Sequence, residues 1–345
     1  MNPRRTLARP TMREVAALSG TSLKTVSRVF NSVPTVDPVL TEKVLKAAKK
    51  LNYTPNMTAG SLRRTNGKTN TIGILLEDIS NPFSASLYRI YEDYAAENGY
   101  IILAGSLDEE PEREHELVNL FISRRVDGLL IAPSGNDHAY LKGEVAKGMH
   151  FGFIDRPPVN FKADAVLSTN REGSSEAVNH LISFGHQRIL FLGDDPAIYT
   201  AEERYQGYAK ALKSAKFGLD KKLVLRGLEN EESAIAEVRK VLRSADAPTA
   251  IFATQNLLTW VAMKALRAEK LEEKVALVGF DDIPGAELLR PAVTLVKQDL
   301  AEMGRRSIEM LFSRINGDIS EVQTVTVPTT LTAMGSGEIS APKRR

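Results

Sequence analysis

Two kinds of hydrophobic pattern alternate along the chain from Thr71 onward. Short apolar runs such as TIGILL predict buried strands, and the longer segments between them, with apolar residues every three or four positions, predict amphipathic helices. The predicted strands are 71–78, 100–106, 126–134, 150–155, 165–170, 188–194, 222–227, 249–254 and 275–282. The predicted helices are 83–98, 110–125, 140–147, 172–184, 202–215, 231–244 and 256–269.

Strands that alternate with helices predict parallel sheets that are covered by helices on both faces. The alternation comes in two successive runs, which favours two similar α/β lobes over one very wide sheet. Ligands of such folds bind beyond the carboxyl ends of the strands. Two facing lobes would therefore place both sets of strand ends around one cleft.

The N-terminal stretch has a different pattern, with two short amphipathic segments on either side of Gly20. Thr11 is placed to cap the first helix, and Glu14 lies where the acidic partner of a capping box belongs. Glycine tolerates the left-handed backbone of a sharp turn, and Ser22 is placed to cap a second helix that runs to about Phe30. This pattern predicts an all-α helix-turn-helix head, whose second helix lies in the DNA major groove. An ordinary helical hairpin in a larger bundle is the alternative.

Charge distinguishes these two interpretations. Residues 1–68 carry 13 Lys or Arg and 3 Asp or Glu, a net charge of +10. Residues 69–345 carry 32 and 40, a net charge of −8, although the net charge of the chain is only +2. A strongly basic head on an acidic body is typical of nucleic-acid binding. We therefore interpret the head as a DNA-binding domain.

A third helix is predicted to begin at Asp37-Pro38, because aspartate is a favoured cap and proline a favoured first helical residue. This third helix has a stripe of apolar residues that we expect to pack on the first two helices. They are Val39, Val44, Leu45, Ala48 and Leu51. Residues 57–64 are long enough for one or two helical turns. With Gly60 inside, this segment is expected to order only when something holds it.

The composition excludes several kinds of site. The chain has no cysteine, which rules out disulfides, iron–sulfur clusters, thiolate zinc sites and cysteine nucleophiles. The five histidines have no metal-ligand spacing, and no nucleophile or phosphate loop accompanies the carboxylates Asp281 and Asp282. We therefore expect no catalytic residue, metal or cofactor. The absence of a secretory signal and of any run long enough to span a bilayer predicts a cytoplasmic protein.

Motifs over nearly the whole chain resemble the lactose-repressor/galactose-repressor (LacI/GalR) family of bacterial transcription regulators. They are REVAALSGTSLKTVSRVFN, LNYTPN, TAGSLRR, IGILLEDISNPF, RRVDGLLI, FIDRP, HLISFGHQRILFLGD, ERYQGY, VGFDD and TLVKQD. Each motif alone is weak, whereas their order and spacing together are specific. The resemblance implies a homodimer in which a hinge helix joins each head to a core shaped like periplasmic sugar-binding proteins. Since the chain ends soon after LTAMGSGEIS, we expect a dimer rather than a tetramer.

The resemblance divides the chain into three parts. These are a helix-turn-helix domain at 1–55, a hinge helix with linker at 56–70, and a ligand-binding and dimerisation core at 71–345. The first lobe is expected at about 71–168 with 299–320, and the second at about 169–298 with 321–335.

The resemblance also implies which residues contact DNA. Leu23 and Lys24 open the second helix where family members read bases. Lys24 is suited to donate to guanine and Leu23 to touch a thymine methyl, although Leu23 could instead be a buried packing residue. Leu62 matches the hinge leucine that inserts into the minor groove, or packs between two hinge helices. The expected contacts are Thr11, Ser22, Leu23, Lys24, Thr25, Ser27, Arg28, Asn31, Tyr53, Asn56, Ala59, Leu62 and Arg63.

Candidate effector contacts follow the strands of the core. Carboxylates, an arginine fork and an aromatic ring in a water-poor cleft suit polyhydroxylated ligands, so we expect a sugar or a nucleoside. For Arg156 and Asp281 an ion pair, mutual or with neighbours, is the alternative role. The family usually has Asp where this chain has Asn256, which favours a ligand other than a common hexose. The expected contacts are Asp78, Asn81, Phe83, Arg156, Asn170, Arg204, Asn256 and Asp281.

These features predict a sequence-specific transcriptional regulator, most simply a repressor. Its dimer would bind a pseudo-palindromic double-stranded operator, and a small effector between the lobes would control the affinity. Two alternatives come from other classes. A solute-binding protein would need an export signal and no basic head, and a sugar-modifying α/β enzyme would need a catalytic acid and base or a phosphate loop.

Overall fold

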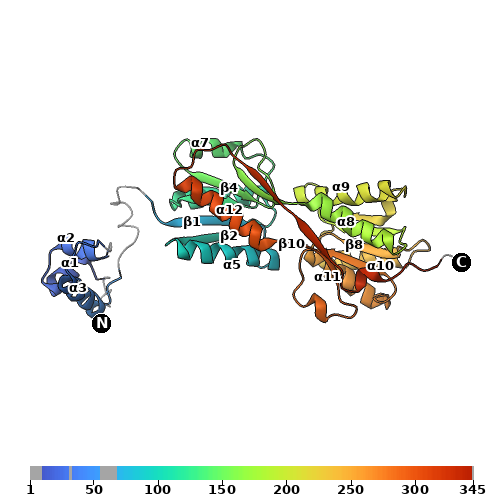
Figure 1. Ribbon diagram of the computed structural model, residues 1–345, viewed down its shortest axis with the longest axis horizontal. Coiled ribbons are helices and arrows are strands. Elements are labelled where there is room, and N and C mark those ends of the chain that lie inside the picture. The colour runs from blue at the N-terminus through green and yellow to red at the C-terminus, as the bar shows by residue number, and fades with distance from the viewer. Residues whose placement is uncertain (1–9, 31–32, 55–67, 344–345) are drawn as a thin grey trace, which may run out of the picture. The chain divides into compact units, whose positions relative to one another are not determined.

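The computed structural model describes residues 10–30, 33–54 and 68–343. The chain divides into two units, Met1–Thr69 and Asn70–Arg345, which we call the head and the core. Both are drawn in Figure 1. The segment predicted to form the hinge helix, 57–64, lies outside the described residues.

The described residues of the head form the helices α1 (Met12–Ser19), α2 (Leu23–Phe30) and α3 (Pro38–Leu51). The predicted capping box is present, with the Thr11 N–H donating to Glu14 Oε2 over 2.6 Å. Gly20 ends α1 in the left-handed conformation, at φ 64°, as a tight turn requires. Asp37 caps α3 by accepting from the Val39 N–H over 2.8 Å.

Side chains from all three helices meet in one small core. Its members are Val15, Ala16, Val26, Val29, Val44, Ala47 and Ala48. The predicted stripe on α3 was partly wrong, because Val39 and Leu45 are 60% and 49% exposed. Residues spaced by three and four from Val44 share its face, which brings in Ala47 and leaves Leu45 about 100° away.

The first sheet of the core is entirely parallel. Its strands are β1 (Thr71–Leu76), β2 (Ile101–Ser106), β3 (Gly128–Ile131), β4 (His150–Ile154), β5 (Asp164–Ser168) and β11 (Thr324–Val327). They lie in the order β11-β5-β4-β3-β1-β2. Leu75 is opposite both Gly105 and Ile131.

The second sheet repeats this plan with one antiparallel edge strand, β12. Its strands are β6 (Ile189–Gly193), β7 (Val224–Arg226), β8 (Ala250–Ala253), β9 (Ala276–Phe280), β10 (Thr294–Gln298) and β12 (Thr329–Thr332). They lie in the order β12-β10-β9-β8-β6-β7. The predicted fold class, two lobes of parallel sheet flanked by helices, is confirmed.

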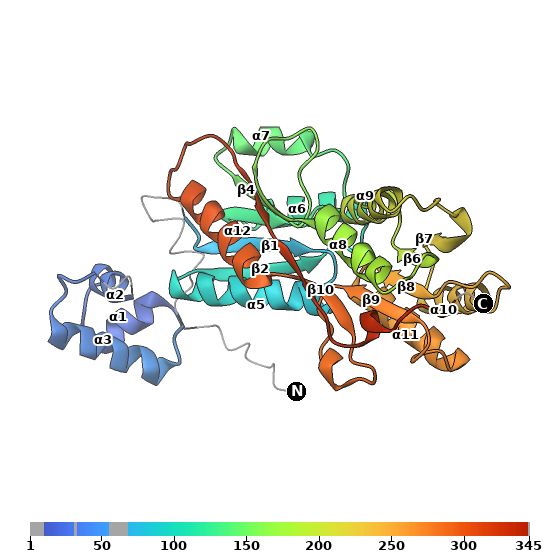
Figure 2. The same ribbon diagram turned by 45° about the vertical axis from the view of Figure 1, so that its right-hand side comes forward.

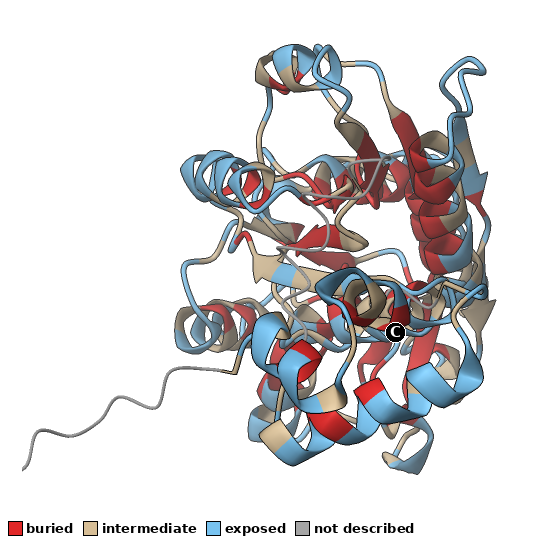
Figure 3. Cartoon of the chain, turned by 90° about the vertical axis from the view of Figure 1, so that its left-hand side faces the viewer, coloured by how far each residue is buried: buried red, intermediate tan, exposed pale blue. Residues whose placement is uncertain are grey.

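Helices cover both faces of each sheet. The first sheet packs against α5 (Pro82–Glu97) and α12 (Leu300–Ile315) on one face and α6 (Pro111–Ser123) on the other, with the short α7 (Lys142–Val145) nearby. The second packs against α10 (Glu231–Leu242) and α11 (Asn256–Glu269) on one face and α8 (Asn170–Ser183) and α9 (Tyr199–Ser214) on the other. Figure 3 shows the buried residues in the strands and on the helix faces turned toward them.

The chain crosses between the lobes at three places. They follow β5, β10 and β11. Two of the crossings are bonded to each other, because the Thr329 N–H donates to Thr169 Oγ1 over 2.8 Å and the Thr169 N–H donates to Val327 O over 3.1 Å. Because the chain crosses back after β10, α12 lies beside β4 in the first lobe although it follows a strand of the second (Figures 1 and 2).

The predicted lobe assignment of 321–335 needs correction. Thr324 pairs with Ala165, so β11 extends the first sheet, and only β12 belongs to the second. The reason lies in the sequence TVTVPTTLT, where two similar β-type segments flank Pro328. Proline lacks the N–H that a ladder needs, so the change of sheet falls at this residue.

Candidate functional site

The first turn of α2 in the head presents adjacent exposed side chains. Ser22 caps the helix, accepting from the Thr25 N–H over 3.0 Å. Val26 is fully buried, whereas Leu23 is 42% exposed and Lys24 is exposed beside it. Leu23 therefore does not have the buried packing role that the sequence left open. An exposed leucine and lysine at the N-terminus of the second helix suit contact with base edges in a groove.

The other head residues expected to contact DNA have more varied positions. The Arg28 guanidinium is exposed and bonds the Thr35 hydroxyl, while Ser27 is half-buried. The Thr11 and Thr25 hydroxyls both engage in helix-start contacts, with Glu14 and Ser22.

The Tyr53 ring packs on Phe30, with ring centroids 5.4 Å apart. Five further expected contacts, in the loop after α2 and in the hinge, lie outside the described residues. They are Asn31, Asn56, Ala59, Leu62 and Arg63.

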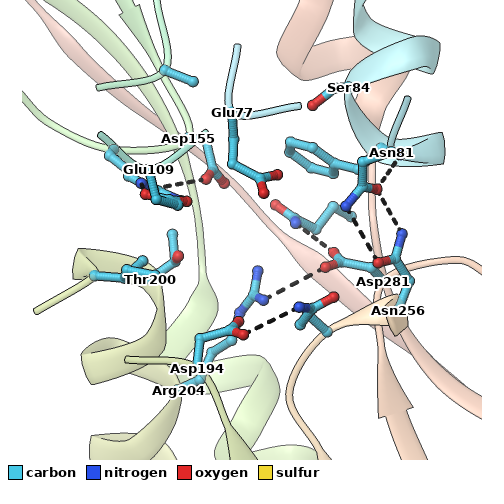
Figure 4. Close-up of a pocket in the computed structure, with 16 residues that line it drawn as sticks. Glu77, Asn81, Ser84, Glu109, Asp155, Asp194, Thr200, Arg204, Asn256 and Asp281 are labelled. Atoms are coloured by element: carbon cyan, nitrogen blue, oxygen red, sulfur yellow. Dashed lines mark hydrogen bonds and ion pairs between the residues drawn. The ribbon is translucent and has the colours of Figure 1, made fainter. Parts of the chain in front are cut away.

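The core has a cavity where the carboxyl ends of its two sheets face each other (Figure 4). Its lining comes from both lobes. The lining residues are Glu77, Asn81, Phe83, Ser84, Glu109, Ala132, Asp155, Arg156, Asp194, Ile198, Thr200, Arg204, Gln255, Asn256, Asp281 and Gln298. The cavity volume is about 110 Å³, well below the roughly 300–1,000 Å³ of pockets for drug-sized ligands.

Asp155 and Asp281 occupy equivalent places in the two lobes. Asp155 follows β4, Asp281 follows β9, and both have a left-handed backbone at φ 68°. Each N–H donates to the neighbouring strand, at 2.9 Å to Val166 O and 2.8 Å to Val296 O. Aspartate is one of the few residues that tolerate this conformation. The repeated geometry aims one carboxylate from each lobe at the cavity.

Arg204 on α9 is held by neighbours from three segments. Its Nε donates to Asn170 Oδ1 over 2.7 Å, and its Nη1 donates to Thr254 O over 2.6 Å and lies 3.5 Å from Asp281 Oδ2. The guanidinium also lies over the Phe280 ring, 4.0 Å from its centroid. Such a planar, fixed fork is suited to donate to ligand oxygens.

The close approach of α8 and α9 that allows the Asn170–Arg204 hydrogen bond depends on Gly207. A Cβ at that position would overlap Arg171 O and lie 2.7 Å from the Ser174 Cβ. Glycine is therefore required by packing here and not by its backbone angles.

Arg156 has a comparable position in the first lobe. It forms a two-pronged ion pair with Glu109, with one Nη1–Oε2 distance of 2.6 Å, and also donates to Pro133 O over 3.1 Å. Its Nε lies 3.6 Å from Asp155 Oδ2. Arg156 thus lines the cavity and also forms an ion pair with a neighbour. Asp281 likewise lines the cavity and lies beside Arg204.

The electrostatics of the cavity disfavour its own negative charges. Burial, and then repulsion from Glu109, raises the pKa of Glu77 to about 7. Burial likewise raises the pKa of Asp155 and of Asp194, although Arg156 and Arg204 act in the opposite direction on both carboxyls. Buried carboxyls whose pKa values rise for these reasons are typical of functional clefts.

Six of the eight residues expected to contact an effector line this cavity, and Asp78 and Asn170 do not. The Asp78 carboxylate turns back onto its own loop and accepts from the Ser80 N–H over 2.8 Å. Asn170 is buried behind Arg204 and positions it.

The sequence-based set missed most of the carboxylates. Glu77 and Asp194 directly follow β1 and β6, and Asp155 directly follows β4, so their place at strand ends was a usable signal. Glu109 has no such signal, because only the folded chain brings it to Arg156, 47 residues away.

Two kinds of feature are absent from the parts of the chain that the structure describes. No group of three or more His, Cys, Asp or Glu there is arranged to hold a metal ion. None of the helices found in those same ranges is long and apolar enough to cross a membrane.

Comparison with known proteins gives matches over both units. Residues 11–56 match the model of bacterial regulatory proteins, lacI family, and residues 178–336 match the periplasmic binding protein-like domain. The HTH-type transcriptional regulator DegA of Bacillus subtilis (strain 168) is 31% identical over 299 residues, which cover 85% of this chain and 88% of that protein.

Solved structures agree with this result. The transcriptional regulator CelR in complex with cellobiose is 30% identical, with a TM-score of 0.68, and the match covers 95% of this chain and 100% of that one. The Lac repressor dimer bound to operator and the anti-inducer ONPF is 23% identical, with a TM-score of 0.83 over 96% of this chain and 99% of that one. The match to the Lac repressor shows that this chain has the same fold.

A helix-turn-helix head and a two-lobed receptor core together define a ligand-responsive transcriptional regulator. The chain belongs to the lacI family of bacterial regulatory proteins. The family inferred from the sequence motifs is therefore confirmed, and its members compared above are regulators rather than enzymes.

Proposed function

We propose that this chain is a cytoplasmic, non-enzymatic repressor that acts as a homodimer on a pseudo-palindromic operator and responds to a small effector in the core cavity. The observation that carries the proposal is that side chains from both lobes line one cavity. A ligand there would contact both lobes at once and favour one relative position of the lobes over others. A ligand can shift such an equilibrium only by binding the two states with different affinity.

The effector we propose is a single sugar unit. The small cavity volume supports a monosaccharide over a disaccharide, although the solved relative CelR was determined with cellobiose. The polar lining of carboxylates, amides and a guanidinium supports a ligand with several hydroxyl groups. Asn81, Phe83, Arg156, Arg204, Asn256 and Asp281 are the proposed contacts.

On the DNA side, we propose that Leu23 and Lys24 read bases while Ser22, Thr25, Ser27 and Arg28 contact phosphates or flanking bases. Residues 1–68 carry a net charge of +10, which supports attraction to the DNA backbone. The Lac repressor dimer bound to operator provides the precedent for a dimer. Each protomer would contact one half-site, so operator symmetry would follow the symmetry of the dimer.

A gel-retardation assay with fragments of the source genome tests the proposal. We expect a few fragments to be retarded selectively, with affinity that falls steeply as salt rises. Retardation without selectivity, or none, would favour the solute-binding or enzymatic alternatives.

A further inference from the structure

The core cavity contains more acidic than basic side chains. Five carboxylates and two guanidinium groups line it. They are Glu77, Glu109, Asp155, Asp194 and Asp281, with Arg156 and Arg204. If all were ionised, the cavity would have an excess of three negative charges.

Both guanidinium groups already have carboxylate partners. Arg156 binds both oxygens of Glu109, and Arg204 lies beside Asp281 at 3.5 Å while its other contacts are to neutral oxygens. Each arginine therefore has one carboxylate as its nearest acidic partner. Of the remaining three carboxylates, only Asp155 has an arginine nitrogen of the described chain within 4 Å, the Nε of Arg156 at 3.6 Å.

The contacts of these three carboxylates are few. Asp155 is only 7% exposed, yet its Oδ1 has no hydrogen-bond partner, and its Oδ2 lies 3.6 Å from the nearest Arg156 nitrogen. Within residues 10–30, 33–54 and 68–343, the Glu77 carboxylate has neither a hydrogen bond nor an ion pair. Asp194 accepts from the neutral amide of Gln255 over 3.1 Å. Figure 4 shows the Glu77 and Asp155 carboxylates directed toward the open part of the cavity.

The unmatched carboxylates distinguish between classes of ligand. A neutral sugar supplies hydroxyl donors and leaves the excess charge in place, and an anionic sugar increases it. A buried carboxylate that lacks a cation is costly, because the protein interior solvates charge poorly. A protonated primary amine brings a positive charge and three donors. These suit the Glu77 carboxylate and the Asp155 Oδ1, which has no hydrogen-bond partner.

We propose that the effector is a cationic amino sugar whose ammonium group is bound by Glu77 and Asp155, with Asp194 nearby. The inference rests on the proposed effector role of this cavity and adds the charge of the ligand. The sugar hydroxyls would meet Asn81, Arg204 and Gln298. The Gln298 Oε1 is itself buried without a hydrogen-bond partner.

A thermal-shift comparison of matched sugar pairs tests the proposal on the full chain. The pairs are D-glucosamine with D-glucose, D-galactosamine with D-galactose, and D-mannosamine with D-mannose, in an amine-free buffer at neutral pH. A ligand that binds only the native state raises the melting temperature. We expect at least one amino sugar to raise it while its neutral counterpart at equal concentration does not. A shift with a neutral sugar alone, or no shift with any of the three amino sugars, overturns the proposal.

Calorimetry on variants then tests which residues bind the amine. Glu77→Gln and Asp155→Asn should each weaken binding of the active amino sugar more than tenfold, while Glu229→Gln, at an exposed loop position, should not. Since Glu77 has a pKa of about 7, amine binding should release protons from the parent protein and fewer from Glu77→Gln. Equal affinity in all variants would overturn the assignment.

The amino-sugar proposal and the regulator proposal can be contradicted independently of each other. A chain that retards DNA selectively but gains no stability from the amino sugars contradicts the cationic effector and leaves the regulator intact. A chain that is stabilised by an amino sugar but retards no DNA supports the ligand class and contradicts the regulator.

Discussion

The Asn256 side-chain amide donates to Asn81 Oδ1 over 2.8 Å, which joins α11 of the second lobe to the start of α5 in the first. This hydrogen bond crosses the cleft at the edge of the cavity that both residues line. A direct bond between lobes stabilises the arrangement in which the two side chains meet across the cleft, which we call closed, by about 1 kcal/mol. The balance between open and closed cores should therefore depend on it.

Asn256→Ala should shift that balance toward open cores, because Asn81 loses its partner. Since the chain has no cysteine, spin labels can be placed cleanly at Glu97→Cys and Glu229→Cys, one exposed position in each lobe. We expect the distance distribution to broaden toward longer values in Asn256→Ala. Asn136→Ala, an exposed loop variant, serves as control. Identical distributions in both variants would show that the bond does not hold the lobes together.

Stability should depend on pH through Glu77. The folded protein raises the pKa of this carboxyl from its ordinary 4.5 to about 7, so between these values it holds a proton that the unfolded chain has released. The free energy of unfolding should therefore fall as pH rises through this window. The nearby charges are Asp78, Glu109 and Asp194, which act in the same direction, and Arg156, which opposes them.

Glu77→Gln should remove this part of the pH dependence. Because the side chain is partly exposed, we expect the parent to lose roughly 2 kcal/mol more than the variant between pH 4.5 and 7. Denaturant unfolding at several pH values measures the difference. Glu229→Gln should behave as the parent does, and parallel curves for Glu77→Gln and the parent would contradict the raised pKa.

Gly207→Ala should displace Arg204 by disturbing the packing of α9 on α8. The added methyl would overlap Arg171 O, so α8 and α9 must separate and the Asn170–Arg204 hydrogen bond must lengthen. We expect a loss of about 2 kcal/mol in stability, typical of overpacking, together with weaker effector binding. Gly218→Ala is the matched control, since a Cβ there meets nothing within 4 Å. If both variants unfold at the same denaturant concentration, the close approach is not as tight as described.

Lys24→Ala should relax base preference at one position of each half-site. A lysine bonded to a guanine contributes about 1–3 kcal/mol of discrimination. Lys46→Ala removes an exposed charge from α3 and should lower affinity for all sequences alike. Selection from a randomised operator pool measures both. An unchanged preference in Lys24→Ala would show that this side chain reads no base.

Local signals in the sequence were enough to predict the elements of the fold. The Thr11–Glu14 capping box, the Gly20 turn and the Asp37 cap depend on residues within three positions of each other, and all three are present. The alternation of strands and helices is set by side-chain burial on each element. The edge of each sheet that borders the cavity could also be predicted, because ligands of such folds bind beyond the carboxyl ends of the strands.

Relations between distant segments could not be predicted in the same way. The ion pair of Arg156 with Glu109 and the hydrogen bond of Arg204 with Asn170 join residues 47 and 34 positions apart. Nothing in either local sequence indicates its partner. The placement of β11 in the first sheet is a third such case, because its alternating Thr and Val residues would suit the edge of either sheet.

Coupling between the two units is the central claim, and operator affinity measured with and without the stabilising amino sugar tests it most directly. Fluorescence anisotropy of a labelled operator should give a dissociation constant that changes at least tenfold on addition of the sugar, equivalent to about 1.4 kcal/mol. Operator DNA should change the sugar's own dissociation constant by the same factor. Operator affinity that is the same at zero and at saturating sugar would contradict the account.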